Sequence, residues 1–245
     1  MDSNNRPHIV CHMLTSVDGK ITGPFMKTPA VETADRHYES INESFSPQAW
    51  LCGRVTADDN FTFYKKPETD VNAPTVPDGD FVAVADAPMY YVSVDASGRL
   101  AWTDNTLHYA NRPPAHIIEV LTGKASNAYR AFLRRLGISY IMAGEKCLDC
   151  ALAAEKLKIL FGIERLMVSG GGYVNGSFLA EGLVDELSIV IAPATDISSD
   201  TVSLFERMDC LPRHAPVEFE LAEVKRLEGG CVWLHYKTTQ MKTDK

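Results

Sequence analysis

The stretch RLMVSGGGYVNGSFLAEGLVDELSIVIA, residues 165–192, places three consecutive glycines between an apolar run and an amphipathic one. Residues 166–168 predict a buried strand, and residues 173–180 predict a helix that begins directly after Gly170, Gly171 and Gly172. Glycines let a ligand approach the main chain closely, and a helix start presents unpaired N–H groups and a positive dipole end. The segment therefore predicts a phosphate-binding junction, with a tight turn that binds nothing as the alternative.

Composition limits the classes of function that the chain can have. Its 245 residues suffice for one large α/β domain or two small ones, and 45% hydrophobic residues are typical of a globular protein. A net charge of -8 argues against a general nucleic-acid binder, although it allows a local basic pocket. No apolar run reaches the roughly 18 to 20 residues that span a bilayer, and residues 1–10 do not resemble a signal peptide. We expect a cytoplasmic protein that binds neither nucleic acid nor membrane.

The six cysteines are too sparse for a disulfide scaffold, and most are expected to be small buried apolar side chains. They are Cys11, Cys52, Cys147, Cys150, Cys210 and Cys231. The pair Cys147 and Cys150 forms one C-x-x-C, which suits a redox pair or half of a zinc site. Because no second such pair and no nearby histidine pair accompanies it, the start of an ordinary helix is the favoured interpretation, and no metal is expected.

Strand and helix patterns alternate along most of the chain. Strands are expected at residues 8–14, 49–52, 89–94, 116–120, 139–143, 165–168, 187–192, 219–224 and 231–236, and helices at residues 33–45, 126–136, 148–160 and 173–180. This alternation predicts a three-layer αβα fold with a single mixed, mostly parallel sheet. A turn at Gly229 and Gly230 predicts a C-terminal antiparallel hairpin. We expect one domain over residues 1–245, with a long surface loop at residues 65–88 that either forms a substrate wall or is an inert insertion.

Three segments together resemble the reductase domain of the bifunctional riboflavin-biosynthesis deaminase/reductase, the RibD C-terminal domain family of the dihydrofolate reductase-like superfamily. They are LTSVDGKITG at 14–23, LCGRVTADDNF at 51–61 and VSGGGYVNGSFLAEGLVDELSIVIAP at 168–193, and the resemblance spans about residues 7–236. It implies a mixed sheet flanked by helices, a homodimer, and NADPH as the cofactor. The zinc signature of the deaminase half is missing from the sequence, so hydrolytic deamination is not expected.

The resemblance assigns a set of residues to NADPH. Gly53 to Thr56 is similar to the G-R-x-T of dihydrofolate reductases, in which Arg and Thr hold cofactor phosphates, and a surface ion pair with Asp58 or Asp59 is the alternative role for Arg54. Asp58 aligns with an acidic cofactor-contacting residue, or else caps a short helix. Ser93 or Asp95 could meet the adenosine ribose, or be ordinary polar residues of a strand end. The full set is Thr15, Gly53, Arg54, Thr56, Asp58, Ser93, Gly170, Gly171, Gly172, Tyr173 and Val174.

The substrate side departs from the family pattern. Ser169 stands where the pathway reductases usually carry glutamate, and His12 stands where they commonly carry a lysine that faces the substrate. His12 could equally be a core histidine. Lys65 or Lys66 lies close to where the family places a basic ligand of the substrate phosphate.

The loop at residues 15–20 lies over the nicotinamide in the superfamily. In it Asp18 could hold the loop closed, place a proton or simply form a turn, and Lys20 either contacts substrate or is solvated. His12 and Asp18 are the catalytic candidates, and Ser169, Lys20 and Lys65 the substrate-binding candidates.

These residues support three hypotheses. The first is an NADPH-dependent reductase that resembles the enzyme of the riboflavin pathway and delivers hydride to a carbonyl or imine carbon of a small polar substrate, with or without a phosphate. The second is an NADPH reductase of another substrate on the same fold, which Ser169 and His12 favour. The third is a nucleotide-binding homodimer that has lost its chemistry.

Overall fold

The computed structural model describes residues 5–195, 197–209 and 215–239 of the chain. Its internal contacts divide the chain into two compact units. The first comprises Met1–Pro7 and Gln48–Leu166, and the second comprises His8–Pro47 and Met167–Lys245. A single domain over residues 1–245 stays a prediction.

The first unit is built on parallel strands. They are β2 (Ala49–Gly53), β3 (Tyr90–Val94), β5 (Ala115–Leu121) and β6 (Ser139–Met142), and neighbours pair in that order. The short strand β4 (Thr106–Leu107) pairs antiparallel with the start of β5. Every residue of β5 is buried, as expected for a strand that is covered on both faces.

Each parallel strand of this unit is followed by a helix or a turn at its carboxyl end. The short helix α2 (Arg54–Ala57) and the π-helical turn η3 (Asp58–Thr62) follow β2, α3 (Asn127–Leu136) follows β5, and α4 (Cys150–Phe161) follows β6. A side-chain N-cap is present at the start of each of the two longer helices. The Ser126 hydroxyl accepts from the Tyr129 amide, and the Asp149 carboxylate accepts from the Leu152 amide.

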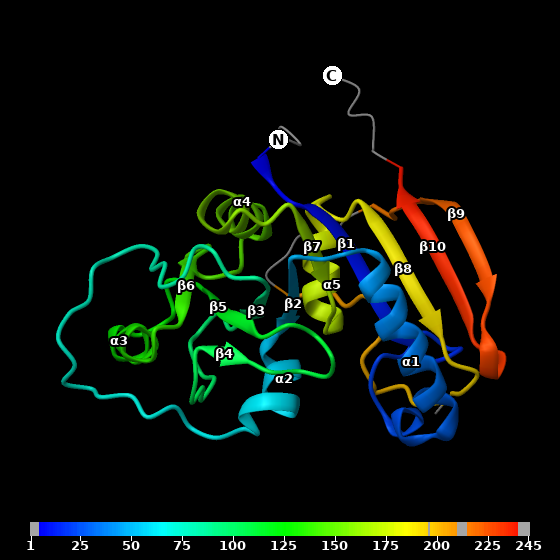
Figure 1. Cartoon of the computed structure of the whole chain (residues 1–245), viewed down its shortest axis with the longest axis horizontal. Helices are drawn as coiled ribbons and strands as arrows, with labels where there is room; N and C mark the ends of the chain where they lie inside the picture. Colours follow the sequence, from blue (N-terminus) through cyan, green and yellow to red (C-terminus); the bar gives the residue numbers. More distant parts are fainter. Residues whose placement is uncertain (1–4, 196, 210–214, 240–245) are drawn as a thin grey trace. The chain divides into compact units, whose positions relative to one another are not determined.

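The segment at 65–88, between η3 and β3, contains no regular helix or strand, which confirms the predicted long loop (Figure 1). It is nevertheless held at its middle. Asp80 accepts from the Met142 amide at 2.8 Å and from the Lys156 ammonium at 2.9 Å. Phe81 forms an isolated antiparallel bridge with Tyr140.

The second unit carries four hydrogen-bonded strands in the order β1 (His8–Thr15), β8 (Glu186–Ile191), β10 (Val232–Thr238), β9 (Phe219–Arg226). The first two are parallel and the remaining pairings are antiparallel. The chain turns between β9 and β10 through η4 (Glu228–Gly230), so the predicted C-terminal hairpin is confirmed. The strand β7 (Arg165–Val168) contains the boundary between the units, and α5 (Gly172–Ala180) follows it.

Helix α1 (Pro29–Ser44) packs against β1 and β8, as Figure 1 shows, and closes the core of the second unit. A short 3-10 turn, η2 (Pro24–Lys27), precedes α1 and buries Phe25. The core cluster joins side chains of η2 and α1 to those of the strands that they cover: Leu14, Phe25, Val31, Ala34, Val190, Ala192, Cys231 and Trp233. Burial of these side chains supplies the main stabilisation of the unit.

All nine predicted strands are present, whereas two details were predicted wrongly. Helix α1 begins at Pro29 rather than at residue 33, and the two-residue strand β4 was not predicted.

The described cysteines form no disulfide. Four of them are buried, namely Cys11, Cys52, Cys150 and Cys231, and Cys147 is half-buried. Cys210 lies outside the described residues. Within the described ranges, no helix combines the length and apolar character needed to cross a bilayer.

Candidate functional site

The glycine segment of the second unit forms a strand-to-helix junction, as predicted. Gly171 is the N-cap residue of α5, and its carbonyl accepts from the amides of Val174 and Asn175 at 3.0 Å each. Gly170 has a φ of 97°, and the Gly170–Gly171 peptide is cis. Within the described part of the chain, the amides of Gly172 and Tyr173 have no acceptor. Unpaired amides at the positive end of a nine-residue helix suit an anionic group.

The glycines of this junction serve different purposes. A Cβ built on Gly172 would lie 2.3 Å from the Ser203 carbonyl oxygen, and one on Gly176 would lie 2.0 Å from the Glu206 carbonyl oxygen. These two glycines are therefore required by the segment that packs on α5. A Cβ on Gly171 would meet nothing within 4 Å. Gly171 is thus the position at which a ligand could approach the main chain.

The loop after β1 is held by a hydrogen bond within it and by bonds to the segment around residue 201. The Ser16 hydroxyl donates to Asp18 at 2.6 Å, and the Lys20 ammonium donates to the Thr201 carbonyl at 3.0 Å. Hydrogen bonds from the Ser16 and Thr195 hydroxyls lower the pKa of Asp18, so its exposed carboxyl is ionised at neutral pH. The bond from Ser16 fits both the loop-holding role and a simple turn, so the role of Asp18 stays a prediction. Thr15 is buried.

His12 is a core histidine, which was the alternative to a role in catalysis. Its ring is fully buried and stacks on Tyr38 with a centroid distance of 4.3 Å. Its Nε2 lies 2.9 Å from the Tyr38 carbonyl oxygen, and its Nδ1 lies 2.9 Å from the Ser188 hydroxyl, which also accepts from the Trp233 indole. Both ring nitrogens therefore have protein partners, and neither is directed to a substrate. Ser169 is half-buried between β7 and α5.

In the first unit, β2 ends in Gly53, which is the N-cap residue of α2, and Arg54 opens that helix. The Arg54 guanidinium donates to Asp58 at 2.8 Å, and the Thr62 hydroxyl donates to the other Asp58 oxygen at 2.5 Å. The ion pair considered for Arg54 is therefore present. Asp58 is buried, whereas 32% of the Arg54 side chain stays exposed, so Arg54 can also reach a ligand. Thr56 is half-buried on the same short helix.

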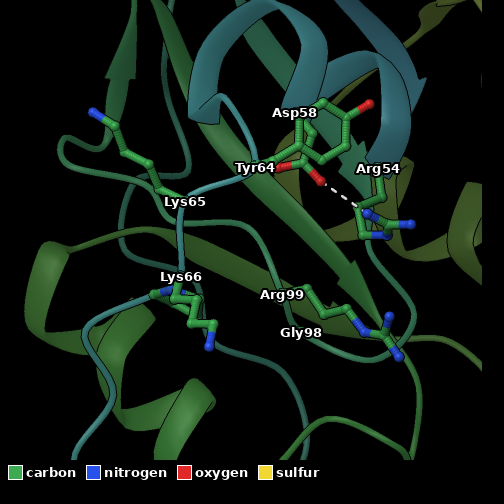
Figure 2. A pocket seen from close by; sticks show the side chains of 8 residues that line it. Arg54, Asp58, Tyr64, Lys65, Lys66, Gly98 and Arg99 are labelled. Atoms are coloured by element: carbon green, nitrogen blue, oxygen red, sulfur yellow. Dashed lines mark hydrogen bonds and ion pairs between the residues drawn. The ribbon is translucent and has the colours of Figure 1, made fainter.

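Arg54 and Asp58 line a pocket of about 300 Å³, which is shown in Figure 2. The other lining residues are Tyr64, Lys65, Lys66, Pro67, Gly98 and Arg99. Lys65, which the sequence assigned to substrate, is thus brought together with Arg54. Lys66 was predicted only as the alternative to Lys65, and Arg99 was not predicted from the sequence. The only local signal for Arg99 is the turn after β3 that contains Gly98, which has a φ of 69°.

Asp95 supports the turn that carries Arg99. One oxygen of its buried carboxyl accepts from the amides of Arg99 and Leu100. The sequence suggested contact of Ser93 or Asp95 with a ribose, but both side chains are buried and Asp95 is directed to the main chain of its own turn. Asp95 is therefore a positioning residue for Arg99.

Glu119 on β5 is a fully buried carboxyl of the same unit, and one of its oxygens accepts from the Trp102 indole. Its other oxygen has no hydrogen-bond partner among the described residues. Burial, and secondarily the charge of Asp95, raise the pKa of Glu119 well above 4.5. Burial also raises the pKa of Asp95. Above pH 4.5 the folded protein therefore keeps a proton on Glu119, whereas the unfolded chain loses it.

This proton predicts a pH-dependent stability. As the pH rises above about 4.5, the free energy of unfolding falls by up to about 1.4 kcal/mol per pH unit. The fall ends once the pH passes the raised pKa of Glu119. We expect Glu119→Gln to remove that slope, because the amide does not titrate. Urea unfolding of both proteins from about pH 5 to pH 8 measures the two slopes. Equal slopes would show that Glu119 does not hold the proton, and Glu145→Gln on the surface is the control.

Comparison with known proteins gives a family and several relatives. The model of the RibD C-terminal domain matches residues 7–232. A 2,5-diamino-6-ribosylamino-4(3H)-pyrimidinone 5′-phosphate reductase from Methanothermobacter thermautotrophicus is 47% identical over 53 residues, which is 22% of this chain and 24% of that relative. The chain therefore spans about a quarter of the length of the curated relative in this match.

Solved structures resemble the whole chain. A pyrimidine reductase-like protein from Corynebacterium diphtheriae has a TM-score of 0.66 at 16% identity, over 97% of this chain and 94% of that chain. One form of Acinetobacter baumannii RibD has a TM-score of 0.61 at 21% identity, over 97% of this chain and 59% of that chain. Rib7, the riboflavin biosynthesis reductase of Saccharomyces cerevisiae, has a TM-score of 0.56 at 15% identity, over 98% and 93% of the two chains. The likeness confirms the predicted α/β fold class with its mixed sheet.

Proposed function

Because the chain belongs to the RibD C-terminal domain family, we propose that it is a reductase of riboflavin biosynthesis that uses NADPH to reduce a phosphorylated aminopyrimidine. The family match over residues 7–232 carries this proposal. The relatives named for pyrimidine reduction support the substrate class. In this reaction a ribose in its open form, bearing the aminopyrimidine, would become a ribityl chain.

The residues present fit the cofactor. The unpaired amides of Gly172 and Tyr173 and the open position at Gly171 fit a phosphate in the second unit, and the partly exposed Arg54 fits one in the first. When bound, NADPH would supply the hydride. The chain would contribute binding and orientation, and the loop held by Ser16 and Lys20 would exclude water.

A turnover assay tests the proposal. The protein is mixed with NADPH and either 2,5-diamino-6-ribosylamino-4(3H)-pyrimidinone 5′-phosphate or 5-amino-6-(5-phosphoribosylamino)uracil, and the loss of reduced nicotinamide absorbance is followed. We expect oxidation of NADPH that depends on one of these compounds and is much slower with the dephosphorylated compound. Saturable binding of NADPH without turnover of either compound would contradict the pathway assignment.

A second candidate function is the reduction of a different substrate by NADPH on the same fold. The burial of His12 favours it, because the position that commonly holds a substrate-facing lysine here has both ring nitrogens bonded within the protein. Turnover of other carbonyl compounds in a substrate panel, with both aminopyrimidines inert, would identify this function.

A further inference from the structure

Residues 201–206 form a bridging segment that is paired with the loop after β1. The Ile21 amide donates to the Val202 carbonyl at 3.0 Å, and the Leu204 amide donates to the Gly19 carbonyl at 3.0 Å. The residues between these two bonds form an isolated antiparallel bridge. Main-chain hydrogen bonds on both sides of a bridge fix the register of the pairing. The loop after β1 therefore takes its position from the bridging segment.

The bridging segment also rests on the start of α5. The Glu206 amide donates to the Gly172 carbonyl at 2.9 Å. A Cβ on Gly172 would lie 2.3 Å from the Ser203 carbonyl oxygen, and one on Gly176 would lie 2.0 Å from the Glu206 carbonyl oxygen. Main chain therefore packs directly on main chain over the first two turns of the helix.

Leu204 joins the loop to the helix through its own peptide groups. Its amide donates to Gly19, and its carbonyl accepts from the side-chain amide of Asn175 at 2.9 Å. Asn175 lies in the first turn of α5, and its main-chain amide donates to the Gly171 carbonyl at 3.0 Å. One asparagine therefore connects the glycine junction, the bridging segment and the loop.

The Asn175 side chain is fully buried, and its Oδ1 has no hydrogen-bond partner among the described residues. A buried polar atom without a partner lowers stability, and an apolar side chain of similar size would avoid that cost. Packing alone therefore does not account for an asparagine at this position. The bond from its Nδ2 to Leu204 is what this residue supplies and an apolar one lacks.

We propose that Asn175 is a positioning residue that holds the loop at residues 16–21 against the start of α5 through Leu204. The inference rests on the proposed function, in which NADPH binds at the unpaired amides of Gly172 and Tyr173 and the loop excludes water. An anion bound at those amides fixes the first turn of α5, and the bond of Asn175 passes that constraint to the bridging segment and the loop. Cofactor binding and closure of the loop are thereby coupled.

Amide hydrogen exchange of the full chain tests the link between helix and loop without any ligand. We expect Asn175→Ala to speed the exchange of the Ile21 and Leu204 amides at least about tenfold, because their bonds lose the support of α5. The amides of β5, in the first unit, should keep their rates. Asn175→Asp should act in the same direction, because an ionised carboxylate keeps the shape of the side chain but cannot donate.

Asn127→Ala is the matched control. Asn127 also lies at the start of a helix, α3, and its side-chain amide donates to the loop carbonyls of Ala73 and Pro74 at 3.3 and 3.2 Å. The variant loses the same kind of bond outside the proposed coupling, so the exchange of Ile21 and Leu204 should stay unchanged. Urea unfolding midpoints show that each variant retains the fold.

Addition of NADPH tests the coupling itself. In the parent protein we expect saturating NADPH to slow exchange of the Ile21 amide at least about tenfold, and in Asn175→Ala less than about twofold. Steady-state kinetics of Asn175→Ala with the aminopyrimidine should show kcat lowered about tenfold and KM for NADPH changed less than about threefold. This split is expected because the amides that bind the anion are retained, whereas the loop is no longer held.

The inference is overturned if neither Asn175 variant speeds exchange at Ile21 and Leu204, or if exchange rises equally in β5, which would mean a loss of overall stability. A kcat of Asn175→Ala equal to that of the parent protein would also contradict it. Faster exchange in the variants of a protein that neither binds nor oxidises NADPH keeps the link between α5 and the loop and discards the proposed function. Normal turnover with unchanged exchange in both variants keeps the proposed function alone.

Discussion

Gly176→Ala is expected to lower the free energy of unfolding by about 3 kcal/mol. The new Cβ would lie 2.0 Å from the Glu206 carbonyl oxygen, 2.9 Å from its carbonyl carbon and 3.2 Å from its amide nitrogen. All three are main-chain atoms, so no side-chain rotation relieves the overlap. Alanine in a helix gains about 1 kcal/mol over glycine, which is too little to offset the overlap. Urea denaturation at fixed pH measures the change.

Gly182→Ala is a less suitable control, because Gly182 has a φ of 68° that strains any other residue. Gly171→Ala is the better one, because a Cβ there meets nothing within 4 Å. A change of stability for Gly176→Ala as small as that for Gly171→Ala would show that the segment containing Glu206 moves away from α5 at little cost.

Gly171→Ala is expected to lower kcat/KM for NADPH by about 100-fold while the unfolding midpoint stays close to that of the parent protein. The methyl group would occupy the open position at Gly171, the residue directly before the unpaired amides of Gly172 and Tyr173, and would displace a phosphate that binds there. Steady-state kinetics at varied NADPH, together with calorimetric binding of NADPH, measure the effect. Unchanged affinity in a folded variant would mean that the cofactor does not contact this junction.

The repeating pattern of apolar residues was sufficient to predict the strands, because each buried strand shows as a short apolar or alternating run. It was insufficient for the start of α1. Pro29 follows Thr28, the N-cap residue, and a proline in the first helical position is compatible with a helix. The two-residue strand β4 is too short to produce a pattern of its own.

The site was predictable only where its chemistry is local in sequence. The glycine junction and the Gly53 to Thr56 segment were found because a strand end, glycines and a helix start follow one another directly. The packing role of Gly172 and Gly176 was not predictable, since the atoms that require it lie near residues 203–206. Arg99 was missed for the same reason, because only the fold brings its turn beside Arg54. The expected homodimer stays a prediction.

The anchoring of the long loop at its midpoint has a consequence for how the protein can change over evolution. Asp80 and Phe81 are hydrogen-bonded to residues of β6 and α4. A change in the stretch before them is therefore not transmitted to the stretch that leads into β3. The Glu68 carbonyl accepts from Arg135 at 2.8 Å, so insertions or deletions among the exposed residues 69–72 would be absorbed between that contact and the anchored Asp80. The length of this stretch could thus vary without shifting the register of the strand that follows.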